Sequence, residues 1–136
     1  ASNVGRIRAA LEPLGARVVA LASNAVPPCF ALVWLGMGED GHIASLFPGM
    51  PGIDQALDPG QAPGALVGLA PDWPQVRLSL NLSMLLSTGW LGLLAFGETK
   101  RECIEAVLAD TPQSRQWPLH ALLWQARVLP NIYWAP

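Results

Sequence analysis

Three consecutive residues, Asp40, Gly41 and His42, place a carboxylate and an imidazole on one glycine-rich bend. A carboxylate beside an imidazole fixes the orientation of the ring and prepares it for proton transfer near neutral pH. Gly41 allows a backbone conformation that a β-carbon would penalise. Backbone N–H groups in such a bend, here including Gly38 and Gly41, can hold an anion or a developing oxyanion. The bend therefore predicts acid–base chemistry, with His42 transferring the proton and Asp40 supporting it.

Two other interpretations of the same bend remain open at this level. Residues Gly36 to Gly41 match the G-x-G-x-x-G spacing of a dinucleotide-binding loop between a predicted strand and a predicted helix. However, the two acids of the bend would repel a pyrophosphate, and only Asp54 or Asp58 could serve as the ribose-binding acid expected about 20 residues later. In the purely structural interpretation, the acids complement a helix dipole and the histidine caps or packs.

The elements that must position this bend alternate between strand and helix patterns. Helical spacing predicts a first helix that Asn3 can cap and that closes at Pro13 and Gly15, followed by helices at 98–110 and 117–126 and a helical turn at 84–88. Strand patterns occupy 17–22, 29–36, 76–82, 90–97 and 131–134. Residues 48–75 contain six prolines interleaved with glycines and are predicted to form one long ordered loop.

Unbroken apolar runs such as 29–36 are typical of parallel strands buried on both faces. The pattern therefore predicts an α/β fold with a mostly parallel sheet flanked by helices. The bend follows one of these strands. In open α/β sheets, ligands bind at the carboxyl ends of the strands, so this edge is the predicted site.

Composition limits the function classes. The 136 residues are 51% hydrophobic and 13% charged, with a net charge of −2, which indicates a single α/β domain over residues 1–136 and excludes disorder. Eight scattered Lys and Arg residues argue against nucleic-acid binding, and no apolar run is long enough to span a membrane. Cys29 and Cys103 have neither metal-ligand nor disulfide-framework spacing, which favours a cytoplasmic protein.

The bend and its surroundings resemble a known family. The stretch LGMGEDGHIASLFPG, residues 35–49, is similar to the signature of the 6-phosphogluconolactonases, within the sugar-phosphate isomerase/CoA-transferase-like superfamily of Rossmann-like folds. Further similarities follow in order along the chain: SNVGRIRAAL, RLSLNLSMLL, LLAFGETKRECIEAVL and PLHALLWQARVLPNIYWAP.

The resemblance implies hydrolysis of 6-phospho-D-glucono-1,5-lactone to 6-phosphogluconate in the oxidative pentose phosphate pathway, without metal or cofactor. It implies His42 as general base on water, Asp40 as its support, and Lys100 as a ligand of the substrate phosphate. Arg77 is a candidate contact for substrate oxygens. From the pattern alone, Lys100 is more often a solvated helix lysine, and only the family resemblance favours the phosphate ligand. Arg77 can equally be a snorkelling edge residue, and His120 is an ordinary helix residue.

Two departures from the family pattern also carry expectations. Related deaminases have a glutamate five residues after the motif histidine, where this chain has Phe47, so deamination is disfavoured. The chain matches the C-terminal part of a lactonase and lacks the N-terminal phosphate loop and a helix between 22 and 29. The alternative function is therefore a truncated or non-catalytic sugar-phosphate-binding module, completed by a homodimer or by a missing N-terminal part.

Overall fold

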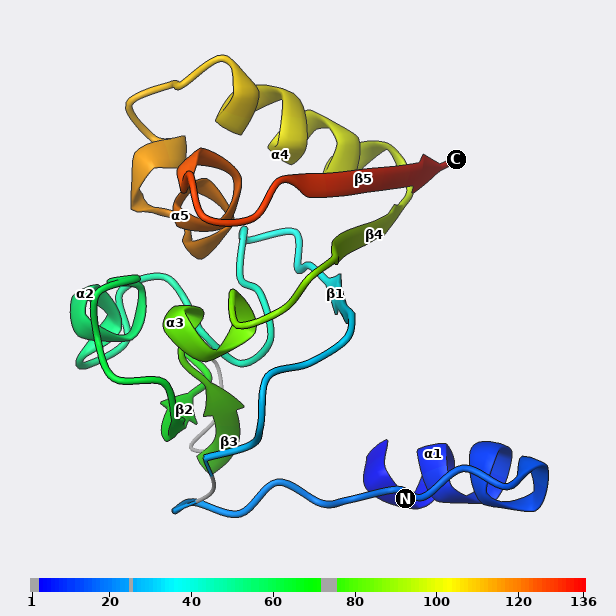
Figure 1. Ribbon diagram of the computed structural model, residues 1–136. Helices are drawn as coiled ribbons and strands as arrows, with labels where there is room; N and C mark the ends of the chain where they lie inside the picture. Colours follow the sequence, from blue (N-terminus) through cyan, green and yellow to red (C-terminus); the bar gives the residue numbers. More distant parts are fainter. Residues whose placement is uncertain (1–2, 25, 72–75) are drawn as a thin grey trace.

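A three-stranded parallel sheet forms the centre of the computed structural model, which describes residues 3–24, 26–71 and 76–136. The strand order is β1–β4–β5, formed by Val33–Gly36, Leu91–Phe96 and Pro130–Ala135 (Figure 1). Val33 of β1 aligns with Leu91 of β4, which aligns with Pro130 of β5. The strands predicted at 90–97 and 131–134 and the mostly parallel, helix-flanked sheet are confirmed.

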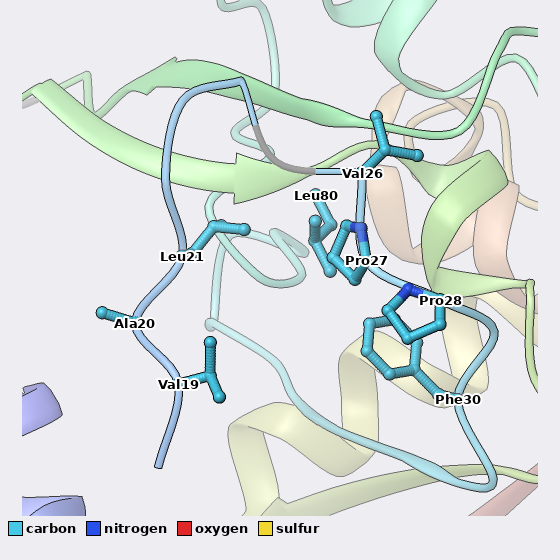
Figure 2. Close-up of a pocket in the computed structure, with 8 residues that line it drawn as sticks. All are labelled: Val19, Ala20, Leu21, Val26, Pro27, Pro28, Phe30 and Leu80. Carbon is cyan, nitrogen blue, oxygen red and sulfur yellow. The ribbon is translucent and has the colours of Figure 1, made fainter.

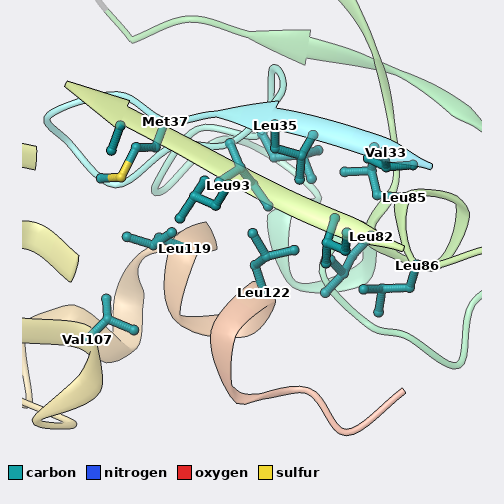
Figure 3. Close-up of a cluster of buried hydrophobic side chains, with 14 of the residues drawn as sticks. Val33, Leu35, Met37, Leu82, Leu85, Leu86, Leu93, Val107, Leu119 and Leu122 are labelled. Carbon is teal, nitrogen blue, oxygen red and sulfur yellow. The ribbon is translucent and has the colours of Figure 1, made fainter. Parts of the chain in front are cut away.

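Two helices after β4 cover one face of this sheet. Helix α4, Glu98–Leu108, begins directly after Gly97, and α5, Pro118–Trp124, carries a proline in its first turn, where the missing N–H needs no partner. A 3₁₀ turn, Ser114–Gln116, joins them. Side chains from both helices pack with strand residues in the main core, among them Val107, Leu119, Leu122 and Leu93 (Figure 3). Both helices were predicted from the sequence.

No described residue range covers the opposite face of the sheet. The connections β1→β4 and β4→β5 advance across the sheet in one direction, and because such crossovers are right-handed they lie on the same face. Val33 and Leu35 on the covered face are buried, whereas Trp34 is 52% and Phe96 is 58% exposed. The prediction that strands 29–36 and 90–97 are buried on both faces is therefore wrong.

An antiparallel hairpin stands apart from the parallel sheet. Its strands are β2, Ala65–Leu69, and β3, Val76–Leu80, and β3 was predicted. The prediction that residues 48–75 form one long loop is wrong where β2 forms, because residues 65–70 contain no proline and can pair with β3. The loop also contains the short helix α2, Ile53–Ala56, and its residues 72–75 lie outside the described ones.

Strand β3 ends where a new helix begins. The Asn81 side chain accepts a hydrogen bond from the Met84 N–H at 2.9 Å and so caps α3, Leu82–Leu85. The predicted strand 76–82 is therefore two residues too long, and the helical turn predicted at 84–88 begins at Leu82 instead.

The amino-terminal segment differs most from expectation. Helix α1, Asn3–Leu11, begins at Asn3 and passes through a 3₁₀ turn, Glu12–Leu14, to Gly15 in a left-handed conformation, so this predicted helix is confirmed. No residue of α1 is buried. The strand predicted at 17–22 is wrong, because this extended segment has no ladder partner among the described residues. The strand predicted at 29–36 is reduced to β1, preceded by an isolated bridge between Phe30 and Thr88.

Candidate active site

The bend of residues 37–42 lies at the carboxyl end of β1, where the sequence placed it. The Nδ1 atom of His42 lies 2.6 Å from Oδ1 of Asp40, and the same oxygen accepts the backbone N–H of His42 at 3.1 Å. Both side chains remain accessible, His42 at 29% and Asp40 at 45%. One carboxylate oxygen thus holds both the backbone and the ring of His42. The Nε2 atom of the imidazole is left for another partner.

No helix follows the bend directly. Ile43 forms bridges with Met37 and Leu46, Ala44 has a φ of 50°, and the next helix, α2, starts only at Ile53. A dinucleotide-binding loop needs a helix N-terminus at this point to receive the pyrophosphate. The dinucleotide interpretation is therefore wrong, and so is the version in which the acids complement a helix dipole.

The glycines of the bend act mainly through the space they leave. The N–H of Gly38 donates to the His42 carbonyl at 3.0 Å, and the N–H of Gly41 donates to the Gly38 carbonyl at 3.1 Å. These two predicted substrate-binding residues therefore use their N–H groups inside the bend. The N–H groups of Glu39 and Asp40 have no hydrogen-bond partner within the described ranges and remain as possible donors to an anion.

An aromatic ring separates the imidazole from the predicted arginine. The ring of Phe47, which is buried, lies 4.6 Å from the ring of His42 between centroids. The guanidinium carbon of Arg77 lies 6.0 Å from the centroid of the same phenyl ring. Arg77 is exposed on β3, opposite Gly68 of β2. From the sequence, Phe47 was significant only because deaminases have a glutamate at this position. Its contact with His42 is visible only in the structure.

Lys100 lies in the first turn of α4, next to the carboxyl ends of two parallel strands. It lines a hollow of about 290 Å³ together with Gly36 and Met37, which precede the bend, and with Trp34, Leu35, Leu94 and Phe96. Lys100 is half-buried and forms no ion pair with the described part of the chain. The structure thus places this cation beside β1, with its charge open to a ligand. The hollow opens on the bare face of the sheet.

Packing behind the bend anchors the catalytic candidates. Ile43 and Leu46 are completely buried, and the N–H of Ser45 donates to the Ser79 hydroxyl of β3 at 3.1 Å. The thiol of Cys103 on α4 donates to the Glu39 carbonyl at 3.2 Å. Helical periodicity indicates that Cys103 faces the core, but no signal in the sequence identifies the carbonyl that it meets.

A second hollow, of about 580 Å³, lies away from this edge and is lined only by apolar side chains and prolines (Figure 2): Val19, Ala20, Leu21, Val26, Pro27, Pro28, Phe30 and Leu80. It contains no group that could transfer a proton. In the described part of the chain, no cluster of three His, Cys, Asp or Glu residues could hold a metal ion. No helix there has the length and apolarity to cross a bilayer.

Comparison with known proteins gives a consistent result. The family model for glucosamine-6-phosphate isomerases/6-phosphogluconolactonase matches residues 3–134. A 6-phosphogluconolactonase from Pseudomonas putida is 38% identical over 115 residues, which cover 85% of this chain and 46% of that protein. One from Caulobacter vibrioides is 40% identical over 124 residues, covering 88% of this chain and 50% of that protein.

Solved structures agree with the sequence comparison. A 6-phosphogluconolactonase from Shewanella baltica superposes with a TM-score of 0.65 at 29% identity, covering 79% of this chain and 45% of that one. The chain thus spans about half the length of the curated relatives that it matches.

Proposed function

Because this chain belongs to the glucosamine-6-phosphate isomerase/6-phosphogluconolactonase family, we propose that it hydrolyses 6-phospho-D-glucono-1,5-lactone to 6-phosphogluconate. This reaction is the lactone-opening step of the oxidative pentose phosphate pathway. The observation that carries the proposal is the 2.6 Å contact between Asp40 and His42 at the carboxyl end of a parallel strand.

In the proposed mechanism, His42 is the general base. Asp40 accepts the hydrogen on Nδ1, so that the neutral ring presents an unprotonated Nε2 to a water molecule. The imidazole of His42 takes one proton from this water as the water oxygen attacks the carbonyl carbon of the lactone. The tetrahedral intermediate then breaks the bond between its central carbon and the ring oxygen of the lactone, and this oxygen receives the proton held by the imidazolium of His42. The products are the carboxylic acid and a free hydroxyl group, and no other reactant is needed.

The charge that develops on the carbonyl oxygen needs donors near the base. The N–H groups of Glu39 and Asp40 are the unpartnered backbone donors of the bend and can serve this purpose. The ammonium group of Lys100 binds the substrate phosphate as a compact cation. Arg77 contacts substrate oxygens from beyond the ring of Phe47. Gly38 and Gly41 leave space that the protein itself fills, with the Asp40 and His42 side chains at Gly38 and with Trp117 at Gly41.

The deaminase branch of the family fits this site less well. Phe47 places a buried phenyl ring against His42, where the resemblance gives deaminases a glutamate. A phenyl ring can neither accept nor donate a proton, so it cannot assist the ring opening that precedes deamination. Lactone hydrolysis requires only the Asp40–His42 pair and water.

The alternative function is a truncated or non-catalytic sugar-phosphate-binding module. The chain covers about half of its relatives, and the hollow at Lys100 opens on an uncovered apolar sheet face. In this alternative, residues 1–136 form an α/β domain equivalent to the C-terminal part of a lactonase. A missing N-terminal part or a homodimer would then cover the face and complete the site.

The described features also support the remaining assignments. Cys29 and Cys103 are both free, which is consistent with a reducing compartment, and we infer that the protein acts in the cytoplasm on a small phosphorylated lactone. The proposed reaction needs no cofactor, nucleic acid or membrane.

The first test is hydrolysis of freshly prepared lactone, coupled to 6-phosphogluconate dehydrogenase and corrected for spontaneous opening. Replacing the general base by His42→Ala should lower kcat by about 10²- to 10⁴-fold. His120→Ala is the matched control, because His120 also contacts an aspartate, Asp110, at 2.8 Å, but at the junction between α4 and α5 and not in the bend. Full activity of His42→Ala would exclude His42 as the base. Inactivity of the folded wild type would favour the alternative.

The phosphate ligand is tested separately. Lys100 is the only lysine of the chain, and its loss removes one charge-assisted hydrogen bond. Such a bond is worth about 1.5–3 kcal/mol, so Lys100→Ala should raise KM roughly 10- to 100-fold with a smaller change in kcat. Arg101→Ala is the control, because the neighbouring Arg101 is paired with Glu98 and Glu105. An unchanged KM would show that Lys100 does not bind the phosphate and is a solvated helix lysine.

A further inference from the structure

The bend that carries Asp40 and His42 is held from behind by the start of α5. Gly41 is buried, with a φ of +78°, and its carbonyl accepts the N–H of Leu119 at 2.9 Å. A β-carbon at Gly41 would lie 2.7 Å from both Cβ and Cγ of Trp117. The Trp117 side chain therefore rests directly on the α-carbon of Gly41. Leu119 itself is completely buried, so this contact ties the bend to the core.

Helix α4 holds the other end of the same bend. The thiol of Cys103 donates to the carbonyl of Glu39, and Cys103 is buried. Burial raises the pKa of this thiol, and the nearby carboxylates of Glu102, Glu39 and Asp40 raise it further, so the group keeps the proton that it donates. The thiol contact and the Trp117 contact thus enter the bend on either side of Asp40.

These contacts fix the two peptide groups that orient the pair. The Glu39 carbonyl belongs to the peptide that leads into Asp40, and the Gly41 carbonyl belongs to the peptide that leads into His42. With both carbonyls held, the backbone between them cannot rotate without breaking one of these two hydrogen bonds. The Asp40 carboxylate then reaches both the N–H and Nδ1 of His42.

We propose that Trp117 is a positioning residue for the Asp40–His42 pair, with the Cys103 thiol as the second support of the same bend. Trp117 does not touch substrate. It acts through Gly41, whose left-handed conformation it keeps in place. The proposal rests on the proposed lactonase function for its kinetic test but not for its spectroscopic one.

The kinetic test replaces the indole first with an aliphatic side chain and then with a smaller aromatic ring. Trp117→Leu keeps Cβ and Cγ but replaces the planar ring, including Cδ2, which lies 2.9 Å from the position of a β-carbon at Gly41, with two methyl groups. It should lower kcat about 10- to 100-fold, because small misplacements of a catalytic group have effects of this size. KM should stay within about two-fold, since Lys100 is held by β4 and α4. Trp117→Phe keeps a planar ring attached at Cγ, with an atom equivalent to Cδ2, and should restore most of the activity.

The matched control lies on the same helix. Trp124 is 55% exposed, stacks on His120 and donates to the Val107 carbonyl, away from the bend. Trp124→Leu should reduce thermal stability and leave kcat unchanged. A wild-type kcat for Trp117→Leu, or equal losses of kcat in the Trp117→Leu and Trp124→Leu variants, would overturn the proposal.

A spectroscopic measurement on two sets of variants keeps the proposal testable if Trp117→Leu does not fold or the wild type proves inactive. The ring-nitrogen chemical shifts of His42, assigned with His42→Ala, report whether Nδ1 keeps its hydrogen bond to Asp40. Trp117→Leu should shift them, whereas Trp117→Phe should not. Cys103→Ala, which lacks the donor, should shift the same signals and lower kcat, and Cys103→Ser should not. Unchanged signals in Trp117→Leu, or in Cys103→Ala if Trp117→Leu does not fold, would overturn it independently of any catalytic result.

Discussion

Gly38 lies beneath the Asp40–His42 pair, and its lack of a side chain makes their contact possible. A β-carbon there would come within 2.2 Å of Nδ1 of His42 and within 2.5 Å of Oδ1 of Asp40. Both distances are far below van der Waals contact. The glycine thus contributes to the candidate chemistry through empty space, which the ring and the carboxylate occupy.

The first prediction concerns this position. Gly38→Ala should push the imidazole and the carboxylate apart and lower kcat about 10- to 100-fold, with little change in melting temperature because both displaced groups are accessible. The kinetics of the coupled assay and a thermal melt measure the two effects. Gly64→Ala is the control, because a β-carbon at Gly64 would meet nothing within 4 Å and Gly64 does not line the hollow at Lys100. Similar activities in the two variants would contradict the steric argument.

At the scale of elements, a polar cluster joins the end of α4 to α5. Asp110 has a φ of 51° and accepts hydrogen bonds from Arg115 at 2.9 and 2.6 Å, and its Oδ1 lies 2.8 Å from Nε2 of His120. The hydrogen bonds from Arg115, and then the contact with His120, lower the pKa of Asp110 to about 2. His120 is therefore part of this junction, in agreement with its assignment as an ordinary helix residue rather than a catalytic one.

This cluster predicts a pH dependence of stability. The pKa of Asp110 is lower in the folded state, about 2 against 3.8, so the unfolded state binds more protons between these values. The stabilisation by Asp110 is thus complete above about pH 4 and is lost as the pH falls through 2. Asp110→Asn, which tolerates the left-handed backbone, should be less stable than wild type at pH 6, and the difference should shrink towards pH 2.

Urea unfolding across this pH range measures the effect. Asp54→Asn on α2 is the control, because no ion pair or hydrogen bond of the Asp54 side chain is present in the described structure. A difference between Asp110→Asn and wild type that stays constant from pH 6 to pH 2 would show that the carboxylate charge of Asp110 has no part in the junction.

Across the molecule, two apolar surfaces are left uncovered by the residues that the structure describes. One is the sheet face of Trp34, Leu94, Phe96 and Tyr133, left bare because both crossovers lie on the opposite side. The other is helix α1, which extends away from the sheet and buries no residue (Figure 1). The stability of this chain therefore comes from the core between the sheet and helices α3, α4 and α5.

The corresponding prediction is that deleting residues 1–15 leaves the melting temperature within about 2 °C of the full chain, because no residue of α1 is buried. Leu119→Ala provides the contrast. It creates a cavity at a completely buried position and should cost about 2–5 kcal/mol, which corresponds to a clearly lower melting temperature. A large loss of stability in the deletion variant would mean that α1 packs on the rest of the chain.

Segments with their own local signals were predicted well. Helices α4 and α5 carry helical periodicity and start directly after Gly97 and at Pro118, and β4 is an apolar run of strand length. Strand β2 and the failure of 17–22 to form a strand were not predictable, because strand formation depends on whether a partner lies alongside. The same holds for the bare sheet face, which follows from the direction of the crossovers.

The acid–base pair of the bend can be predicted from the sequence: a carboxylate and an imidazole lie two residues apart after a strand, with glycines before and between them. These groups are neighbours along the chain, so their proximity needs no long-range information. The tertiary structure alone decided what surrounds them. Trp117 on Gly41, Cys103 on Glu39 and Lys100 beside β1 all depend on how the sheet brings distant segments together, and local patterns do not encode those contacts.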